Sequence, residues 1–215
     1  MYTLAIFLED LLAICLLSLI PPTLLLLLRI RRCYKRRPRM RSNTARLMVV
    51  LGPGGHSAEL AEVIKLMDFA KYTPRCYVCN TTDELSEMRA REIEHPREPY
   101  IQRIHRARNV HQSFFSSIFS TLLSTLQCVP VVWGFQPDLV LCNGPGTCIP
   151  VCVVAFLLGC LWPFREPCRI IFLESFCRVR SLSLSGRILQ WIADLFVVQW
   201  PNLATKDRKY VGRLF

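Results

Sequence analysis

The sequence predicts an α/β fold, a Rossmann-like parallel sheet with helices on both faces. Short apolar runs alternate with stretches of helical periodicity, and this alternation is typical of βαβ units. Hydrophobic residues make up 52% of the chain, a fraction too high for a disordered protein. The length of 215 residues is enough for one such domain and an appendage.

The expected strands are short apolar runs, the first of which ends in a glycine-rich segment. They cover Arg46–Leu51, Arg75–Asn80, Tyr100–Ile104, Asp138–Cys142, Arg169–Leu173 and Leu195–Gln199. The expected helices have apolar residues at helical spacing, apart from one charged surface helix. They cover Ala58–Phe69, Asp83–Glu94, Ser113–Leu126, Thr147–Leu161 and Ser185–Ile192.

The N-terminal segment Leu11–Leu28 carries no charge. As a helix it would measure about 27 Å, close to a bilayer core of roughly 30 Å. Glu9 and Asp10 precede it, and eight basic residues follow between Arg29 and Arg41. The positive-inside rule then puts the N-terminus in the lumen and the rest of the chain in the cytosol. We therefore expect a single-span anchor (1–28), a basic linker (29–45), a Rossmann-like domain (46–198) and a C-terminal tail (199–215).

The net charge of +11 is concentrated in the linker. Without those eight cations the chain has 19 basic and 16 acidic residues, so the domain itself is nearly balanced. A basic run can also be a nucleic-acid or nuclear-import patch. Directly after an apolar span, a stop-transfer signal in contact with anionic lipid is the stronger interpretation, and we expect no nucleic-acid partner.

Ten of the eleven cysteines follow the predicted span, on the cytosolic side, where disulfides are rare. Cys76 and Cys79 form a C-x-x-C pair, but on a strand their side chains would point to opposite faces of the sheet. We expect no metal ion, no disulfide and no cofactor.

Two further stretches, 112–137 and 139–164, are long and almost free of charge. Serine and threonine in the first and an NGPGT interruption in the second favour core helices over membrane spans. One helical stripe in the first stretch could instead press against a membrane surface. It consists of Phe114, Phe115, Ile118, Phe119, Leu122 and Leu123.

Three distinctive segments follow expected strands, where open parallel sheets bind their ligands. They are Gly52–Glu59, Asn143–Thr147 and Glu174–Gly186. Glycine lets the backbone approach a ligand closely, and the start of the following helix attracts an anion. With the imidazole of His56, the carboxylate of Glu174 and the guanidinium groups of Arg178 and Arg180, these loops suit a diphosphate and a hydroxyl awaiting deprotonation.

The first loop also approaches the dinucleotide-binding fingerprint. Gly52, Gly54 and Ser57 match G-x-G-x-x-G except that serine replaces the third glycine. A membrane-anchored dinucleotide-dependent oxidoreductase is therefore an alternative.

Four motifs occur in one order: GPGGHSAE, PDLVLCNGPGTCIP, ESFCRVRSLSLSG and DLFVVQWP. Together they resemble the membrane-anchor subunits of eukaryotic UDP-N-acetylglucosamine transferases, from Arg46 to the C-terminus. The resemblance implies the acceptor-side half of a GT-B glycosyltransferase at the cytosolic face of the endoplasmic reticulum. Such an enzyme adds the second N-acetylglucosamine to dolichyl-diphosphate-N-acetylglucosamine. Pro53 departs from the small polar residue that we expect in this family.

The resemblance also implies a partner, a cytosolic catalytic subunit that binds UDP-N-acetylglucosamine. The length agrees, because 215 residues are too few for two nucleotide-fold domains. A non-catalytic membrane receptor for a soluble enzyme is the remaining alternative.

The expected site residues follow from these loops and from the family pattern. The candidate bases in an inverting, metal-independent transfer are His56 and Glu174. The expected ligands of the acceptor diphosphate are Gly54, Gly55, Asn143, Gly144, Gly146, Thr147 and Arg178. The expected partner-docking residues are Trp200, Pro201, Tyr210, Leu214 and Phe215.

Overall fold

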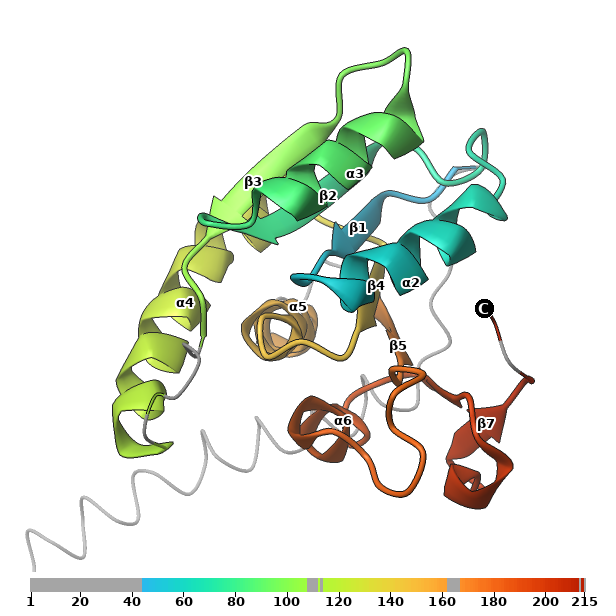
Figure 1. The fold of residues 1–215 in the computed structure, drawn as a ribbon. Coiled ribbons are helices and arrows are strands. Elements are labelled where there is room, and N and C mark those ends of the chain that lie inside the picture. The colour runs from blue at the N-terminus through green and yellow to red at the C-terminus, as the bar shows by residue number, and fades with distance from the viewer. Residues whose placement is uncertain (1–43, 108–111, 113, 162–166, 213, 215) are drawn as a thin grey trace, which may run out of the picture.

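Seven strands form one parallel sheet in the order β3-β2-β1-β4-β5-β6-β7 (Figure 1). The computed structural model describes residues 44–107, 112, 114–161, 167–212 and 214. The predicted anchor and nearly all of the basic linker lie outside these residues. In the middle of the sheet, β1 (Leu47–Val50) pairs with β2 (Arg75–Asn80) on one side and with β4 (Leu139–Asn143) on the other. The predicted parallel α/β sheet is thus confirmed.

The remaining strands extend the sheet to both edges. They are β3 (Tyr100–Ile104), β5 (Arg169–Leu173), β6 (Leu195–Val198) and β7 (Arg208–Tyr210). The predicted bounds of β2, β3 and β5 agree with the structure, whereas β7 was not predicted. A short 3-10 helix, Pro201–Leu203, connects β6 to β7.

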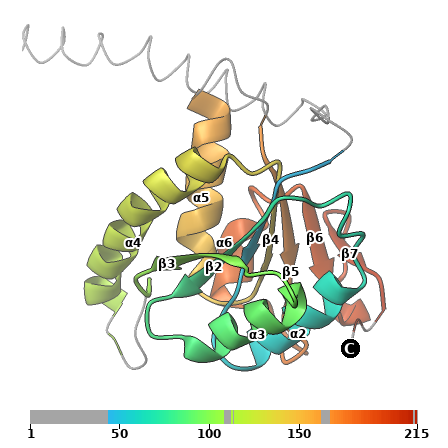
Figure 2. The same cartoon turned by 90° about the horizontal axis from the view of Figure 1, so that it is seen from above.

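Helices cover both faces of the sheet (Figure 2). The helices α2 (Gly55–Lys65) and α3 (Glu84–Glu94) pack on one face, against a core that includes Leu47 and Val49. The other face is covered by α4 (Phe114–Phe135), α5 (Cys148–Leu161) and α6 (Leu184–Leu189). Because both faces are buried, β1 and β2 contain no exposed residue, and β1 is apolar throughout without alternation.

The two cysteines of the C-x-x-C pair lie on opposite faces of the sheet, as predicted. Cys76 belongs to the core under α4, α5 and α6, and Cys79 to the core under α2 and α3. Burial raises the pKa of both thiols to about 12, so both are neutral at physiological pH.

The helix α4 is longer than predicted, since it continues through Pro130 to Phe135. Its C-terminal half places Cys128, Val132 and Phe135 in the core, and the guanidinium of Arg46 donates a hydrogen bond to the carbonyl of Phe135 at 2.7 Å. This packing and the bond at the helix end stabilise the extension despite the proline.

The topology fixes where a ligand can bind. After β1 the chain builds β2 and β3 outward to one edge, and α4 then returns it to β4 on the other side of β1. The direction of growth therefore reverses between β1 and β4. In open α/β sheets, ligands bind outside the carboxyl ends of the strands at such a switch point.

Candidate functional site

Three loops meet at the carboxyl ends of β1, β4 and β5. Val50 near the end of β1 is in register with Cys142 of β4, and Asn143 of β4 is in register with Leu173 of β5. The segments after these strands are the three that the sequence singled out. They are joined by the side chains of Glu59, Asn143 and Ser175.

The first loop turns directly into α2. Gly54 occupies the N-cap position with φ +70°, a left-handed conformation that glycine adopts without strain, and the helix begins at Gly55. The predicted helix began three residues later, at Ala58. Because of the earlier start, His56 belongs to the same helix as Glu59. The two residues are three positions apart and therefore lie on one face of it.

Both of these side chains bond to Asn143 at the end of β4. The Nδ1 atom of His56 lies 2.9 Å from Oδ1 of Asn143. The Nδ2 atom of Asn143 donates to Oε2 of Glu59 at 2.6 Å. The asparagine itself is buried, while His56 and Glu59 are partly exposed. An amide from β4 thus connects an imidazole and a carboxylate of α2.

The second oxygen of Glu59 binds the third loop. Its Oε1 atom accepts hydrogen bonds from the hydroxyl of Ser175 at 3.0 Å and from the backbone N–H of Phe176 at 3.3 Å. One carboxylate therefore ties the start of α2 to the ends of both β4 and β5. Buried and partly buried polar groups of this kind hold loops in a single arrangement when all of their members are bonded.

Gly144 sets the position of the His56 ring from the other side. It has φ +59°, and a Cβ atom added to it would lie 2.6 Å from Cε1 of His56. A larger residue would meet the imidazole and would also be strained in this backbone conformation. The glycine is needed here for close approach to His56, a role that the sequence did not assign to it.

Glu174, the second candidate base, lies in a different environment. It is 1% exposed, and its Oε2 atom accepts hydrogen bonds from the backbone N–H and the hydroxyl of Ser183 at 3.0 and 3.1 Å. Its Oε1 atom accepts from the backbone N–H of Ser175 at 3.2 Å. The Ser183 hydroxyl also caps α6 by accepting from the N–H of Gly186. Glu174 thus holds the loop between β5 and α6 in place.

Burial raises the pKa of Glu174, although the hydrogen bonds from Ser183 and Ser175 and the charge of Arg178 act in the opposite direction. The carbonyl oxygen of Glu174 is also engaged, since it accepts a hydrogen bond from Nε2 of Gln199 at 3.2 Å.

Apart from Gly144, which lies beside His56, the expected diphosphate ligands fall into two groups. Gly54, Gly55 and Gly146 are exposed, and a Cβ atom added to any of them would have no neighbour within 4 Å. Arg178 is also exposed. In contrast, Asn143 is bonded as described, and the buried hydroxyl of Thr147 donates to Oδ1 of Asn80 at 3.0 Å. These two side chains connect the loops to one another.

The expected docking tail folds back beside the third loop. The indole N–H of Trp200 donates to the carbonyl of Phe176 at 2.8 Å, and the two rings are in tilted contact with centroids 5.3 Å apart. Pro201 opens the 3-10 helix, and Tyr210 ends the edge strand β7. The side chain of Leu214 packs on the core beneath α2 and α3. Phe215 lies outside the described residues.

Glu59 and Ser175 were not among the predicted site residues. Glu59 could have been found from its spacing, because His56 and Glu59 are i and i+3 once the helix begins at Gly55. The role of Ser175 depends on a contact across 116 residues of sequence, which no local pattern indicates.

A second notable surface lies on α4. The exposed side of this helix is apolar and includes the largely exposed Ile118, Phe119 and Leu126. Its inward side is polar: the hydroxyls of Ser120 and Thr121 donate to the carbonyl of Ala107, and that of Ser124 to the carbonyl of His105. The usual arrangement of an amphipathic surface helix is thus inverted over this part of α4.

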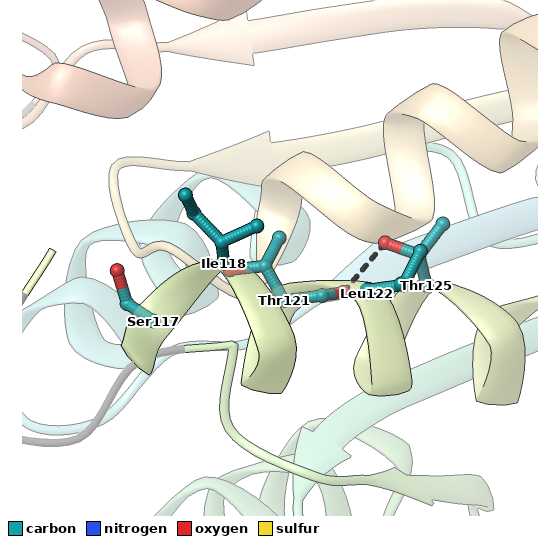
Figure 3. Close-up of a pocket in the computed structure, with 5 residues that line it drawn as sticks. All are labelled: Ser117, Ile118, Thr121, Leu122 and Thr125. Carbon is teal, nitrogen blue, oxygen red and sulfur yellow. Dashed lines mark hydrogen bonds between the residues drawn. The ribbon is translucent and has the colours of Figure 1, made fainter. Parts of the chain in front are cut away.

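The same helix carries a shallow hollow of about 330 Å³ (Figure 3). It is lined by Ser117, Ile118, Thr121, Leu122 and Thr125, so none of the loop residues contributes to it. Over the described residues, the segment Ser116–Phe135 is also the one helix long and apolar enough to cross a membrane, with a mean hydropathy of 1.5. An apolar helix side with several exposed large side chains, among them Ile118, Phe119 and Leu126, is typical of an interaction surface.

Comparisons with known proteins agree with the four motifs. Residues 47–214 match the family described as "Oligosaccharide biosynthesis protein Alg14 like". The chain is 42% identical to UDP-N-acetylglucosamine transferase subunit ALG14 of Rattus norvegicus over 202 residues, which cover 88% of this chain and 92% of that protein. For the Homo sapiens subunit the identity is 44% over 180 residues, or 78% and 82% of the two chains.

Among solved structures, MurG of Acinetobacter baumannii is similar with a TM-score of 0.59 at 16% sequence identity. The match covers 76% of this chain and 44% of the MurG chain. The chain therefore spans less than half the length of MurG, and the likeness concerns the fold alone.

Proposed function

Since the chain belongs to the family of Alg14-like oligosaccharide biosynthesis proteins, we propose that it is one subunit of a UDP-N-acetylglucosamine transferase. In this proposal it binds the lipid acceptor, dolichyl-diphosphate-N-acetylglucosamine, at the membrane of the endoplasmic reticulum. A cytosolic partner subunit binds UDP-N-acetylglucosamine. The complete enzyme adds the second N-acetylglucosamine of the asparagine-linked glycan precursor.

One observation carries the proposal: a partly exposed imidazole lies between two glycine loops at the switch point of the sheet. His56 is at the start of α2, and a Cβ atom added to Gly144 in the second loop would meet its ring. A general base must reach the hydroxyl that it deprotonates, and a partly exposed ring at the ligand-binding edge of the sheet meets this condition.

The glycine loops are the proposed site of the acceptor diphosphate. Gly54 and Gly55 begin α2, and Gly146 lies just before α5, with open space in front of all three. The positive dipole ends of two helices favour an anion at this place. Arg178 on the third loop adds a guanidinium that can bind phosphate oxygens in a bidentate manner.

The proposed step is an inverting displacement. His56 takes the proton of the acceptor sugar hydroxyl, and the hydroxyl oxygen forms a bond to the anomeric carbon of the donor sugar. The bond between that carbon and the diphosphate oxygen breaks, and UDP leaves with the electron pair. His56 then releases its proton to solvent. Glu174 takes no part in this sequence because its carboxylate is buried and bonded to the loop.

The proposed partner surface is the C-terminal tail. Trp200 and Gln199 bond to the Glu174–Phe176 segment, and this segment bonds to Glu59. A partner docked on the tail residues would therefore lie beside the third loop, close enough to present its nucleotide sugar to the acceptor. Tyr210 offers an exposed ring for such a contact.

The apolar side of α4 is a proposed membrane contact in addition to the predicted N-terminal anchor. Its hydroxyls bond to backbone carbonyls of the domain, so the helix is part of the domain and its apolar side faces outward. An apolar helix side of this kind lies in the interface of a bilayer.

This contact can be measured with the full chain in phosphatidylcholine vesicles that contain brominated acyl chains. Tryptophan fluorescence should be quenched strongly in Phe119→Trp, on α4. The matched control is Leu66→Trp, because Leu66 is 84% exposed at the end of α2 on the opposite face of the sheet. Equal quenching in both variants would reject the membrane contact of α4.

The function itself is tested by reconstitution. The chain is combined with and without its partner subunit, UDP-N-acetylglucosamine and the dolichol-linked acceptor, and transfer is followed by product chromatography. Transfer that requires both chains and is lost in His56→Ala supports the proposal. If His56→Ala and Gly54→Ala leave transfer intact while deletion of the tail abolishes it, the chain is a membrane receptor for a complete soluble enzyme.

A further inference from the structure

The carboxylate of Glu59 has no task in the proposed transfer, yet it has contacts with two other loops. It accepts hydrogen bonds from Asn143, from the hydroxyl of Ser175 and from the N–H of Phe176. Its partner Asn143 is buried and bonds directly to His56. The side chains of Glu59, Asn143 and His56 thus form one continuous chain of hydrogen bonds.

The direction of each hydrogen bond follows from the groups present. An ionised carboxylate only accepts hydrogen bonds, so the group of Asn143 that lies 2.6 Å from Glu59 must be its NH₂. The amide oxygen of Asn143 then faces Nδ1 of His56 at 2.9 Å. An amide oxygen only accepts, so Nδ1 of the neutral ring must carry the proton, and Nε2 keeps its lone pair.

We propose that Glu59 and Asn143 are positioning residues that hold the proton of His56 on Nδ1 and thereby make Nε2 the atom that accepts the proton of the substrate hydroxyl. The inference rests on the proposed function, because it names the atom of His56 that acts in that reaction. Neither Glu59 nor Asn143 touches substrate in this arrangement. Both act through the imidazole.

Glu59 could serve only to hold the third loop, since it also binds Ser175 and Phe176. The variant Glu59→Gln separates the two roles. Its amide oxygen can still accept from Ser175 and Phe176, which leaves the loop contacts in place. Its NH₂ group then faces the NH₂ group of Asn143, and two donors cannot bond to each other.

A rotation of the Asn143 amide relieves this mismatch and changes the tautomer of His56. Asn143 turns its amide so that its oxygen accepts from Gln at position 59 and its NH₂ group faces His56. Nδ1 must then accept, so the proton moves to Nε2 and the lone pair that serves as base is lost. We expect kcat to fall about 100-fold with KM nearly unchanged, as for the loss of a general base.

The double variant Glu59→Gln/Asn143→Asp is the rescue. The carboxylate at position 143 accepts from Nδ1–H of His56 with one oxygen and from the new amide at position 59 with the other. The original tautomer is therefore restored, and kcat should recover to within about 10-fold of the unmodified enzyme. A purely structural role of Glu59 does not predict this recovery. Glu62→Gln is the matched control, since the exposed Glu62 lies on the same helix and forms an ion pair with Lys65.

The tautomer is read directly from long-range ¹H–¹⁵N correlation spectra of histidine-labelled full chain in complex with its partner. The chain has four histidines, and His56→Ala identifies the signals of His56. The proposal requires an Nδ1–H ring in the unmodified protein and in the double variant, and an Nε2–H ring in Glu59→Gln.

The outcomes separate the inference from the proposed function. An unchanged tautomer in Glu59→Gln overturns the positioning role, whatever happens to the rate. A reversed tautomer with unchanged kcat supports the positioning role and overturns the assignment of His56 as the base. A reversed tautomer with a lowered kcat that the double variant restores supports both.

Discussion

Two hydrogen-bond networks lie side by side at the carboxyl edge of the sheet, one around His56 and one around Glu174. Both contain a titratable side chain, a serine and a glycine that leaves room for the titratable group. The His56 network is partly exposed, and it engages one nitrogen of the imidazole while the ring remains accessible. The Glu174 network is buried, and both oxygens of the carboxylate accept hydrogen bonds from the protein.

The difference concerns what each network can do for a ligand. A side chain acts as a base only when a lone pair is both free and accessible, and His56 meets this condition. Glu174 instead links the end of β5 to the start of α6 through Ser183, which is the N-cap of α6. The two networks are connected through Ser175, whose N–H donates to Glu174 and whose hydroxyl donates to Glu59. The buried Glu174 network thus holds the third loop in place, and the partly exposed His56 network bonds to the same loop through Glu59.

The largest expected effect is a loss of transfer activity when the His56 network loses its imidazole. His56→Ala should lower the transfer rate about 1,000-fold, within the range for a general base, without changing the unfolding midpoint or partner binding. The rate is measured on the reconstituted two-subunit enzyme, and binding by co-purification. His95→Ala is the control, because His95 is exposed at the end of α3. A rate within 10-fold of the unmodified enzyme would remove His56 from the chemistry.

The second prediction concerns the stability of the Glu174 network. Glu174→Gln replaces one acceptor oxygen by an NH₂ group that faces a buried N–H, so the free energy of unfolding should fall by about 1–3 kcal/mol. Urea denaturation followed by circular dichroism measures the change. Glu92→Gln, at an exposed position of α3, should have no such effect. An unchanged stability together with a strongly lowered kcat would instead support Glu174 as the base.

The third prediction compares the two networks by replacing the glycine beside each of them. In Gly144→Ala the new Cβ would lie 2.6 Å from Cε1 of His56, and in Gly186→Ala it would lie 2.3 Å from Oε2 of Glu174. We expect the first variant to lose about 10-fold in transfer rate, because it displaces the base. The second should mainly lose stability, by about 1–3 kcal/mol, because it disrupts buried hydrogen bonds. Transfer rates and urea midpoints of both variants test whether each glycine has the expected effect. A rate loss confined to Gly186→Ala would contradict the prediction.

The parts of the fold that the sequence predicted are those with a strong local pattern. The bounds of β2, β3 and β5 follow from apolar runs between polar residues. The strand β7 was not predicted, because Arg208 and Lys209 give it the composition of a loop. It forms because Phe196 and Val197 of β6 offer an open edge to pair with, and this pairing is not visible in the local sequence.

The site was predicted at the level of loops and only partly at the level of atoms. His56 stood out because it follows a glycine turn after a strand. The different environments of His56 and Glu174 depend on contacts between residues far apart in the sequence, such as His56 with Asn143 and Glu174 with Gln199. Because the helix starts at Gly55, three residues before the predicted start, the prediction missed that His56 and Glu59 lie on one face of α2.

The smallest expected effect is a dependence of the stability on pH that comes from Glu174. Burial raises the pKa of Glu174 above its ordinary value of 4.5, and its hydrogen bonds and Arg178 offset this only in part. A carboxyl group whose pKa is higher in the folded than in the unfolded chain binds more protons when folded. Its contribution to stability is therefore complete below about pH 4.5 and decreases as the pH rises through the folded-state value.

Glutamine at position 174 does not titrate, so the stability difference between the unmodified chain and Glu174→Gln should be largest in acid and should narrow as the pH rises. Urea titrations of both chains at several pH values between about 4 and about 8 measure this difference. A difference that widens with pH would mean that the donors from Ser183 and Ser175 outweigh burial. Glu174 would then be held as a carboxylate, with its pKa in the folded chain below the ordinary value of 4.5.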